Sequence, residues 1–232
     1  MPKRLILFDI DGTLLWTGGA GSAALRLALE RVYGSADTLD NYDPGGRTIK
    51  EIMDGVLGAA GVSQDVIQQR AGEFHTMLVA ELQRLLSNGR YRVEACPGGW
   101  ELVTTLAKRP DATLGLLTGN PEATARIKLV AAGYDPAVFC AGAFGDESGD
   151  RRALLRLAIQ RSQVVTGETF DLSEVVALGD TARDVRCGQA VGVRTLAVAT
   201  GGDDHAHLVA AQPDHLYKDL TDLDTILQTL WN

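Results

Sequence analysis

Cysteine is scarce in this sequence and follows no regular spacing. Only three of the 232 residues are cysteines, Cys96, Cys140 and Cys187. An odd number of cysteines without short paired spacing argues against a disulfide framework and against a cysteine-based zinc site. We therefore expect reduced thiols, which are typical of proteins in the cytosol.

Positive charge is also in short supply. The 22 lysines and arginines are outnumbered by 30 aspartates and glutamates, which gives a formal net charge of -8. An acidic surface argues against nucleic acid or an anionic membrane as the main partner. An anionic substrate therefore needs a local positive charge, from a bound cation or from a well-placed lysine or arginine.

The sequence also lacks a long hydrophobic run. No apolar stretch approaches the length that spans a membrane, and no charged leader precedes an apolar stretch near the N-terminus. Strand-like sequence begins by Leu5, so we expect the mature protein to start there. The reduced thiols lead us to expect a cytoplasmic location. With 45% hydrophobic and 22% charged residues, the composition is that of an ordinary globular chain.

Short apolar runs that alternate with helical segments predict the fold class. Strands are predicted at 5–8, 113–118, 137–141, 175–180 and 193–199, with a weaker one near His215. Such alternation is typical of a parallel, doubly wound α/β sheet. The run at 5–8 is apolar throughout, as expected for a strand buried on both faces at the centre of the sheet.

Residues 16–93 show helical patterns only and stand between the first two predicted strands. Helices are predicted there at 22–33, 48–57 and 63–86. We expect an insertion of this size at the mouth of a sheet to act as a lid over a core made of residues 1–15 and 94–232. The glycines between Gly18 and Gly21 are expected to serve as its hinge.

Acidic and hydroxyl side chains follow three of the predicted strands. Asp9 and Asp11 end the first strand and Thr118 ends the second. Asp180 ends the fourth, and Asp184 follows one helical turn later. The carboxyl ends of parallel strands form the edge where such sheets place their ligands. Clustered carboxylates repel one another unless a cation lies among them, so the pattern predicts Mg²⁺ and a phosphate-like substrate.

The Asp-Xaa-Asp-Gly sequence is also compatible with a calcium-binding loop or a surface turn. A calcium loop of this type needs a glutamate at its twelfth position. The twelfth residue counted from Asp9 is Ala20, which excludes the calcium loop. The acids and the threonine at later strand ends favour a catalytic role over a surface turn.

Three motifs together resemble the haloacid dehalogenase-like (HAD) hydrolase superfamily. The segment Asp9 to Thr13, Asp-Ile-Asp-Gly-Thr after an N-terminal strand, resembles its first motif. Thr118 to Asn120 is similar to the second motif, and 179–184 matches the Gly-Asp-Xaa-Xaa-Xaa-Asp of the fourth. The resemblance extends over nearly the whole chain. The position of the lid and the Pro97-Gly98 turn resemble the phosphoglycolate phosphatase-like subgroup, which implies a Rossmann-like core with a helical cap.

The resemblance assigns roles to the acids. Asp9 would be the nucleophile that forms an aspartyl-phosphate, and Asp11 would be the general acid and then the general base. An acid two residues after the nucleophile favours phosphoryl transfer over dehalogenation. The family pattern implies that Mg²⁺ is held by Asp9, the backbone carbonyl of Asp11, and Asp180. Thr13 would fix the turn.

Further site residues follow from the same resemblance. Thr118 would donate a hydrogen bond to a phosphoryl oxygen, together with backbone N–H groups near Gly119 and Asn120. Asp184 would orient the water molecules on the metal or the cation of the third motif. Arg47, at a predicted helix start in the lid, is a candidate for holding an anionic group on the leaving portion of the substrate.

The lysine of the family's third motif is missing. Lys128 is the only lysine between Thr118 and Asp180, and its position inside a predicted helix indicates that it is badly placed for this role. Arg151, at the expected helix start, is the preferred replacement, and Arg152 is the alternate. Arginine carries a planar guanidinium with several fixed donors, whereas lysine carries a compact ammonium, so the replacement changes the hydrogen-bond geometry at the phosphate.

These observations predict a Mg²⁺-dependent phosphatase that acts on a small soluble phosphomonoester, as a monomer or homodimer, without nucleic-acid or membrane partners. A phosphomutase of the β-phosphoglucomutase type is the first alternative, distinguished by its need for a bisphosphate activator. A phospho-accepting signalling module is disfavoured by the large lid, and an inactive scaffold by the intact acids. A phosphonatase is disfavoured because no lid lysine suits a Schiff base. The sequence leaves the particular phosphomonoester open.

Overall fold

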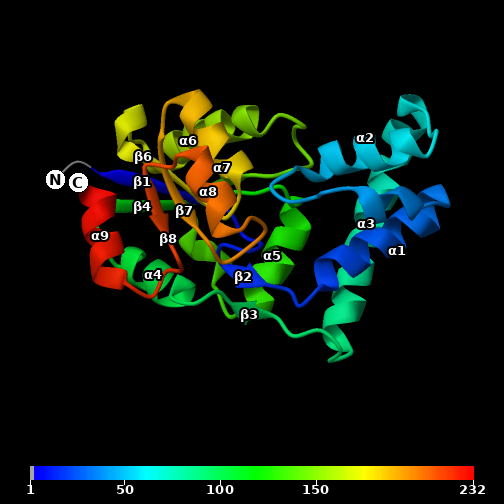
Figure 1. Cartoon of the computed structure of the whole chain (residues 1–232), viewed down its shortest axis with the longest axis horizontal. Helices are drawn as coiled ribbons and strands as arrows, with labels where there is room; N and C mark the ends of the chain where they lie inside the picture. The colour runs from blue at the N-terminus through cyan, green and yellow to red at the C-terminus, as the bar shows by residue number, and fades with distance from the viewer. Residues whose placement is uncertain (1–2) are drawn as a thin grey trace.

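The computed structural model describes residues 3–232 and has two parts, a sheet-based core and a group of helices beside it (Figure 1). The core sheet has six parallel strands in the order β5-β4-β1-β6-β7-β8. Their bounds are β1 Arg4–Phe8, β4 Ala112–Leu117, β5 Ala141–Ala143, β6 Val175–Gly179, β7 Arg194–Val198 and β8 His215–Tyr217. The predicted doubly wound α/β core is confirmed.

The central strand β1 is buried on both faces, as its unbroken apolar sequence predicts. Ile6 and Phe8 belong to one apolar cluster, whereas Leu5 and Leu7 belong to another, because successive side chains of a strand point to opposite faces. The first cluster includes residues of α4 Gly99–Leu106, α5 Glu122–Ala131 and α9 Leu223–Trp231. The second includes residues of α6 Arg151–Thr166 and α7 Ala182–Val191. Helix α8 His205–Ala211 packs near the β8 edge.

The second part is formed by helices between the first strand and the rest of the core. It contains α1 Ala20–Tyr33, the short 3-10 helix η1 Asp37–Asn41, α2 Ile49–Ala59 and α3 Gln64–Ser87. These helices share a hydrophobic cluster of their own, centred on residues such as Leu29, Val56 and Phe74. The two chain segments that join them to the core pair as an antiparallel ribbon, β2 Leu15–Trp16 with β3 Glu94–Ala95.

The predicted third strand is wrong in its position. Residues 137–141 were expected to be extended, but Pro136–Val138 forms a 3-10 turn, η2, and the strand lies at Ala141–Ala143. The Asp135 side chain accepts a hydrogen bond from the backbone N–H of Ala137, at 2.9 Å, which favours the turn over a strand. A further short 3-10 turn, η3 Leu172–Glu174, precedes β6.

The sequence disfavoured both a membrane-spanning helix and a disulfide framework. Within residues 3–232, no helix is both long enough and apolar enough to cross a membrane. Cys96, Cys140 and Cys187 are all free thiols. Burial raises the pKa of Cys96 to about 12 and that of Cys187 to about 11, so both stay protonated at neutral pH.

Candidate active site

The turn after β1 places three polar side chains at the carboxyl edge of the sheet. Asp9 is buried, and Gly12 adopts φ +81, which is a left-handed conformation that favours glycine. A Cβ at Gly12 would collide with the carboxylate of Asp180. Thr13 is fully buried, and its hydroxyl donates a hydrogen bond of 2.9 Å to Asp180 Oδ1. Thr13 therefore links the first turn to the end of β6, beyond the turn-fixing role predicted for it.

Three buried carboxylates lie close together at this edge of the sheet. Asp9, Asp180 and Asp184 each offer one oxygen, and these oxygens lie within 4.8 Å of one another. Burial raises the pKa of Asp9 to about 6, against the lowering effect of Arg151. Burial, with repulsion from Asp184 and Asp9, raises the pKa of Asp180 well above its ordinary value. Because this set of hard oxygen donors carries more negative charge than its surroundings balance, it fits a divalent cation such as Mg²⁺.

Local hydrogen bonds hold two of these acids in place. Asp180 accepts from the backbone N–H of Gly202, at 2.6 Å, in addition to Thr13. Asp184 lies in the first turn of α7, where its Oδ2 accepts from the backbone N–H and hydroxyl of Thr181, at 3.0 and 2.6 Å. This reciprocal pairing is a capping box, so the motif that aims Asp184 into the site also starts the helix.

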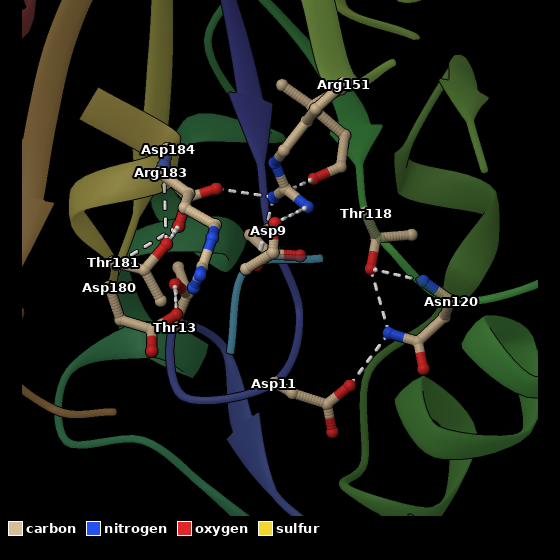
Figure 2. Close-up of polar contacts among 12 residues, drawn as sticks. Asp9, Asp11, Thr13, Thr118, Asn120, Arg151, Asp180, Thr181, Arg183 and Asp184 are labelled. Carbon is tan, nitrogen blue, oxygen red and sulfur yellow. Dashed lines mark hydrogen bonds and ion pairs between the residues drawn. The ribbon is translucent and has the colours of Figure 1, made fainter. Parts of the chain in front are cut away.

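Arg151 is the cation within the carboxylate cluster (Figure 2). It is the first residue of α6, and its Nη2 lies 3.2 Å from Asp9 Oδ2 and 2.5 Å from Asp184 Oδ1. Its guanidinium also donates to the carbonyl of Leu117, and the side chain is 8% exposed. Arg152 instead is exposed and pairs with Asp150. Of the two arginines weighed from the sequence, Arg151 therefore has the location that the missing lysine would need.

Lys128 also reaches the site, but it contacts Asp11 and Asn120, whereas Arg151 contacts Asp9 and Asp184. Its Nζ lies 2.6 Å from Asp11 Oδ2 and 2.6 Å from Asn120 Oδ1, and its side chain is 7% exposed. Helix α5 begins directly after Pro121, and Lys128 lies two turns along it. The sequence signal was present: Lys128 shares the buried face of α5 with Thr124, a polar position within an apolar stripe of the helix.

The end of β4 supplies the polar groups opposite the acids. Thr118 is fully buried, and its Oγ1 accepts a hydrogen bond of 2.8 Å from the Asn120 side chain. The same amide nitrogen of Asn120 lies 2.7 Å from Asp11 Oδ2, so Asn120 connects Thr118 to Asp11 (Figure 2). Gly119 is a position of close approach, since a Cβ there would collide with the backbone carbonyl of Arg47.

Arg47 lies at the mouth of the site but has other partners. Its Nη1 is 2.6 Å from Glu51 Oε1, its Nε donates to the carbonyl of Asp43, and its guanidinium lies over the ring of Tyr42. A role for Arg47 in holding an anionic leaving group remains a prediction. The predicted hinge glycines lie where α1 begins, with Gly18 and Gly19 in left-handed conformations and Gly21 already inside the helix.

A cavity of about 550 Å³ lies between the core and the helices α1 to α3. Its core wall contains Asp9, Asp11, Lys128, Arg151 and Asp180. A charged and polar end of this kind, faced by a second wall, is suited to binding a phosphate group. The carboxylate of Asp11 is 42% exposed and faces the cavity, unlike the buried cluster around Asp9.

Known proteins share both the sequence and the architecture of this chain. Residues 151–223 match the model of the HAD-hydrolase-like family. Over 223 residues the chain is 31% identical to the phosphoglycolate phosphatase of Synechococcus elongatus, covering 95% of each protein. It is 25% identical over 235 residues to the pyrophosphatase PpaX of Bacillus pumilus, covering 96% of this chain and 95% of that protein. A crystal structure of a hydrolase from Pseudomonas syringae has the same fold, with TM-score 0.74 at 21% identity, covering 98% of this chain and 99% of that one.

Proposed function

We propose a mechanism for this chain on the basis of its family: the chain belongs to the HAD-like hydrolases and is a phosphatase. In the proposed reaction, Asp9 attacks the phosphorus of a small phosphomonoester and forms an aspartyl-phosphate while the P–O bond to the leaving group breaks. Water then attacks this acyl-phosphate, which releases inorganic phosphate and regenerates Asp9. The observation that supports this choice is the contact between buried Asp9 and Arg151 at the charged end of the cavity.

Asp11 is proposed as the acid and base of the two steps. It first gives a proton to the departing alkoxide and then takes a proton from the attacking water. Lys128 and Asn120 both lie within hydrogen-bond distance of its Oδ2. They would hold the carboxylate toward the cavity, where both proton transfers are proposed to take place.

Mg²⁺ is the proposed cofactor. Asp9 and Asp180 would bind it through their carboxylates, and the backbone carbonyl of Asp11 would contribute as the family pattern implies. When bound, the ion neutralises negative charge on the substrate phosphate beside the carboxylates. Asp184 would act indirectly, because it is held by Thr181 and paired with Arg151.

The transferring phosphoryl group needs further donors. The hydroxyl of Thr118, backbone N–H groups near Gly119 and Asn120, and the guanidinium of Arg151 are proposed to stabilise the charge on its oxygens. Arg151 is already oriented by Asp9 and Asp184 before substrate binds, which lowers the reorganisation that the reaction requires.

The helices between β2 and β3 are proposed to be a cap, with the domain boundary at residues 16–93. Support comes from their separate hydrophobic cluster and from the two-stranded ribbon through which the chain enters and leaves them. A cap of this kind covers the site and contributes the second wall of the cavity that holds the leaving group. A cytoplasmic location is proposed as well, because all three cysteines are free thiols.

The test is phosphate release from a panel of small phosphomonoesters, with Mg²⁺ or with a chelator. We expect chelator-sensitive turnover that Asp9→Asn abolishes, and a phosphorylated protein that can be trapped by rapid acid quench. Asp224→Asn, which removes an exposed carboxylate on α9, is the matched control and should keep full activity. Turnover that survives in Asp9→Asn would rule out the aspartyl-phosphate, and a requirement for a bisphosphate activator would indicate a phosphomutase instead.

A further inference from the structure

The cavity between core and cap has two chemically different ends. The core end contains the acids and cations of the proposed mechanism. The cap end is lined by apolar side chains from all three cap helices: Ala24, Leu25, Ile49, Ile52, Leu78 and Leu82. Among the described residues, Ser22 is the only hydroxyl that α1, α2 and α3 add to the lining. A ligand that fills this space therefore meets charge at one end and hydrocarbon at the other.

The cations that line the cavity are already matched by acids. Among residues 3–232 these cations are Arg47, Lys128 and Arg151. Arg47 lies 2.6 Å from Glu51, and Lys128 lies 2.6 Å from Asp11. Arg151 is shared between Asp9 and Asp184. No uncompensated positive charge among these residues faces the cap end of the cavity.

This distribution of charge disfavours an ionic leaving group. A carboxylate or a second phosphate at the cap end would lose its hydration against apolar side chains such as Ile52 and Leu78 without gaining a free cation. An alkyl or aryl group would instead be removed from water by the same surface, which is favourable in proportion to the apolar area buried. The cavity volume of about 550 Å³ is in the range that holds drug-sized ligands, so it accommodates a substantial apolar group.

We propose that the substrate is a phosphomonoester with an uncharged, predominantly apolar leaving group, such as an alkyl or aryl phosphate. This inference rests on the proposed phosphatase mechanism, because it takes the charged end of the cavity as the phosphate site. It separates this chain from the relatives named for phosphoglycolate and pyrophosphate, whose leaving groups carry negative charge. The residues that decide the preference are those of the cap wall, with Leu78 of α3 among them.

A series of n-alkyl phosphates tests the proposal, because the leaving-group chemistry stays constant while the chain length grows. The value of kcat/KM is measured for methyl, n-butyl and n-hexyl phosphate and for 2-phosphoglycolate and pyrophosphate, all with Mg²⁺. We expect kcat/KM to rise by about fourfold for each methylene that becomes fully buried. Butyl phosphate should exceed 2-phosphoglycolate by at least about tenfold.

Variants of Leu78 assign the preference to the cap wall. Leu78→Gln keeps a similar volume but places an amide in the wall, so we expect kcat/KM for hexyl phosphate to fall about tenfold. The loss for methyl phosphate should be much smaller, because its leaving group has no chain to place against the wall, and circular dichroism shows whether the variant folds. Leu78→Met and Val66→Gln are the matched controls, because the first keeps the wall apolar and the second alters an exposed position on the same helix.

The outcomes distinguish a failure of the apolar leaving-group proposal from a failure of the proposed phosphatase mechanism. A flat or falling alkyl series, or a preference for 2-phosphoglycolate or pyrophosphate, overturns the apolar leaving group while the phosphatase mechanism stands. Equal losses for methyl and hexyl phosphate in Leu78→Gln would also overturn the role of the cap wall. Absence of turnover on every ester, with no phosphorylation of Asp9, would remove the proposed mechanism and the leaving-group proposal together.

Discussion

At the scale of single residues, the neighbours Arg151 and Arg152 provide a matched comparison. Arg151 is buried between Asp9 and Asp184, whereas Arg152 is exposed beside Asp150. Removing one partner of a buried ion pair leaves the other charges uncompensated. We therefore expect Arg151→Gln to lower the free energy of unfolding by about 3 kcal/mol at neutral pH without metal. Arg152→Gln should cause no measurable change in urea denaturation, and equal effects of the two substitutions would contradict the assignment.

The sequence predicted that the acids at the strand ends lie at one edge of the sheet. It did not predict which acid each lysine or arginine contacts. The placement of Asp9, Asp180 and Asp184 at one sheet edge follows from parallel strands, and the structure brings their oxygens together. The contact between Lys128 and Asp11 was not predicted, because sequence position shows on which face of a helix a residue lies, but not what that face contacts. Its Nζ reaches Asp11, 117 positions away in the chain, only because α5 packs beside the mouth of the sheet.

At the scale of elements, the start of α2 is fastened to the core by contacts from several loops. The backbone N–H of Ile49 donates to the carbonyl of Gly119 at 2.8 Å. Arg183, on α7, donates to the carbonyl of Gly45 at 2.6 Å and pairs with Asp43 at 2.8 Å. These contacts join cap and core at the start of α2, in addition to the β2–β3 ribbon.

Loss of the Arg183 contacts should loosen the cap without touching the reacting groups. Partly exposed ion pairs contribute little, so we expect Arg183→Gln to raise KM about two- to fivefold with only a small change in kcat. Arg186→Gln on the same helix is the control, since Arg186 is exposed. Steady-state kinetics on the best ester measures both values. An unchanged KM in Arg183→Gln would show that these contacts do not hold the cap in the position that substrate binding requires.

The elements themselves follow from local sequence more directly than the contacts between them. The helical periodicity of residues 22–33 and 63–86 predicted α1 and α3, whose starts lie two residues earlier and one residue later than expected. The short edge strand β5 was displaced because a turn capped by Asp135 competes with extended structure there. The contacts that hold the start of α2 against the core were not predicted from the sequence. The backbone carbonyls of Gly119 and Gly145 accept from Ile49 and Lys50 at positions where a Cβ would collide with neighbouring backbone. Glycine permits such an approach, but it does not show which segment will come close.

At the scale of the whole molecule, the buried acids make the stability of the fold depend on pH. In the metal-free protein, the pKa of Asp9 is raised by burial from 3.8 to about 6. Between these values the folded state holds a proton that the unfolded chain has released. Stability therefore falls as pH rises from about 4 to about 6, and it stays at the lower level above pH 6.

A divalent cation should restore the stability that the folded protein loses when the buried carboxylates are ionised. At pH 7, Mg²⁺ at about 100 times its Kd adds about 2.7 kcal/mol, which corresponds to about 5 to 10 °C in Tm for a chain of this size. At pH 4.5 the shift should be small, because the acids hold protons that compete with the metal. Thermal unfolding followed by circular dichroism, with Mg²⁺ or with a chelator, measures both conditions.

Asp180→Asn separates this coupling from a general effect of the salt. The substitution removes one of the repelling charges and one proposed ligand, so the metal-free Tm at pH 7 should rise while the Mg²⁺-dependent shift disappears. Asp224→Asn, at an exposed position far along the chain, should keep both the metal-free Tm and the full shift. A Mg²⁺ shift of the same size in Asp180→Asn would place the cation elsewhere and would disconnect the buried acids from metal binding.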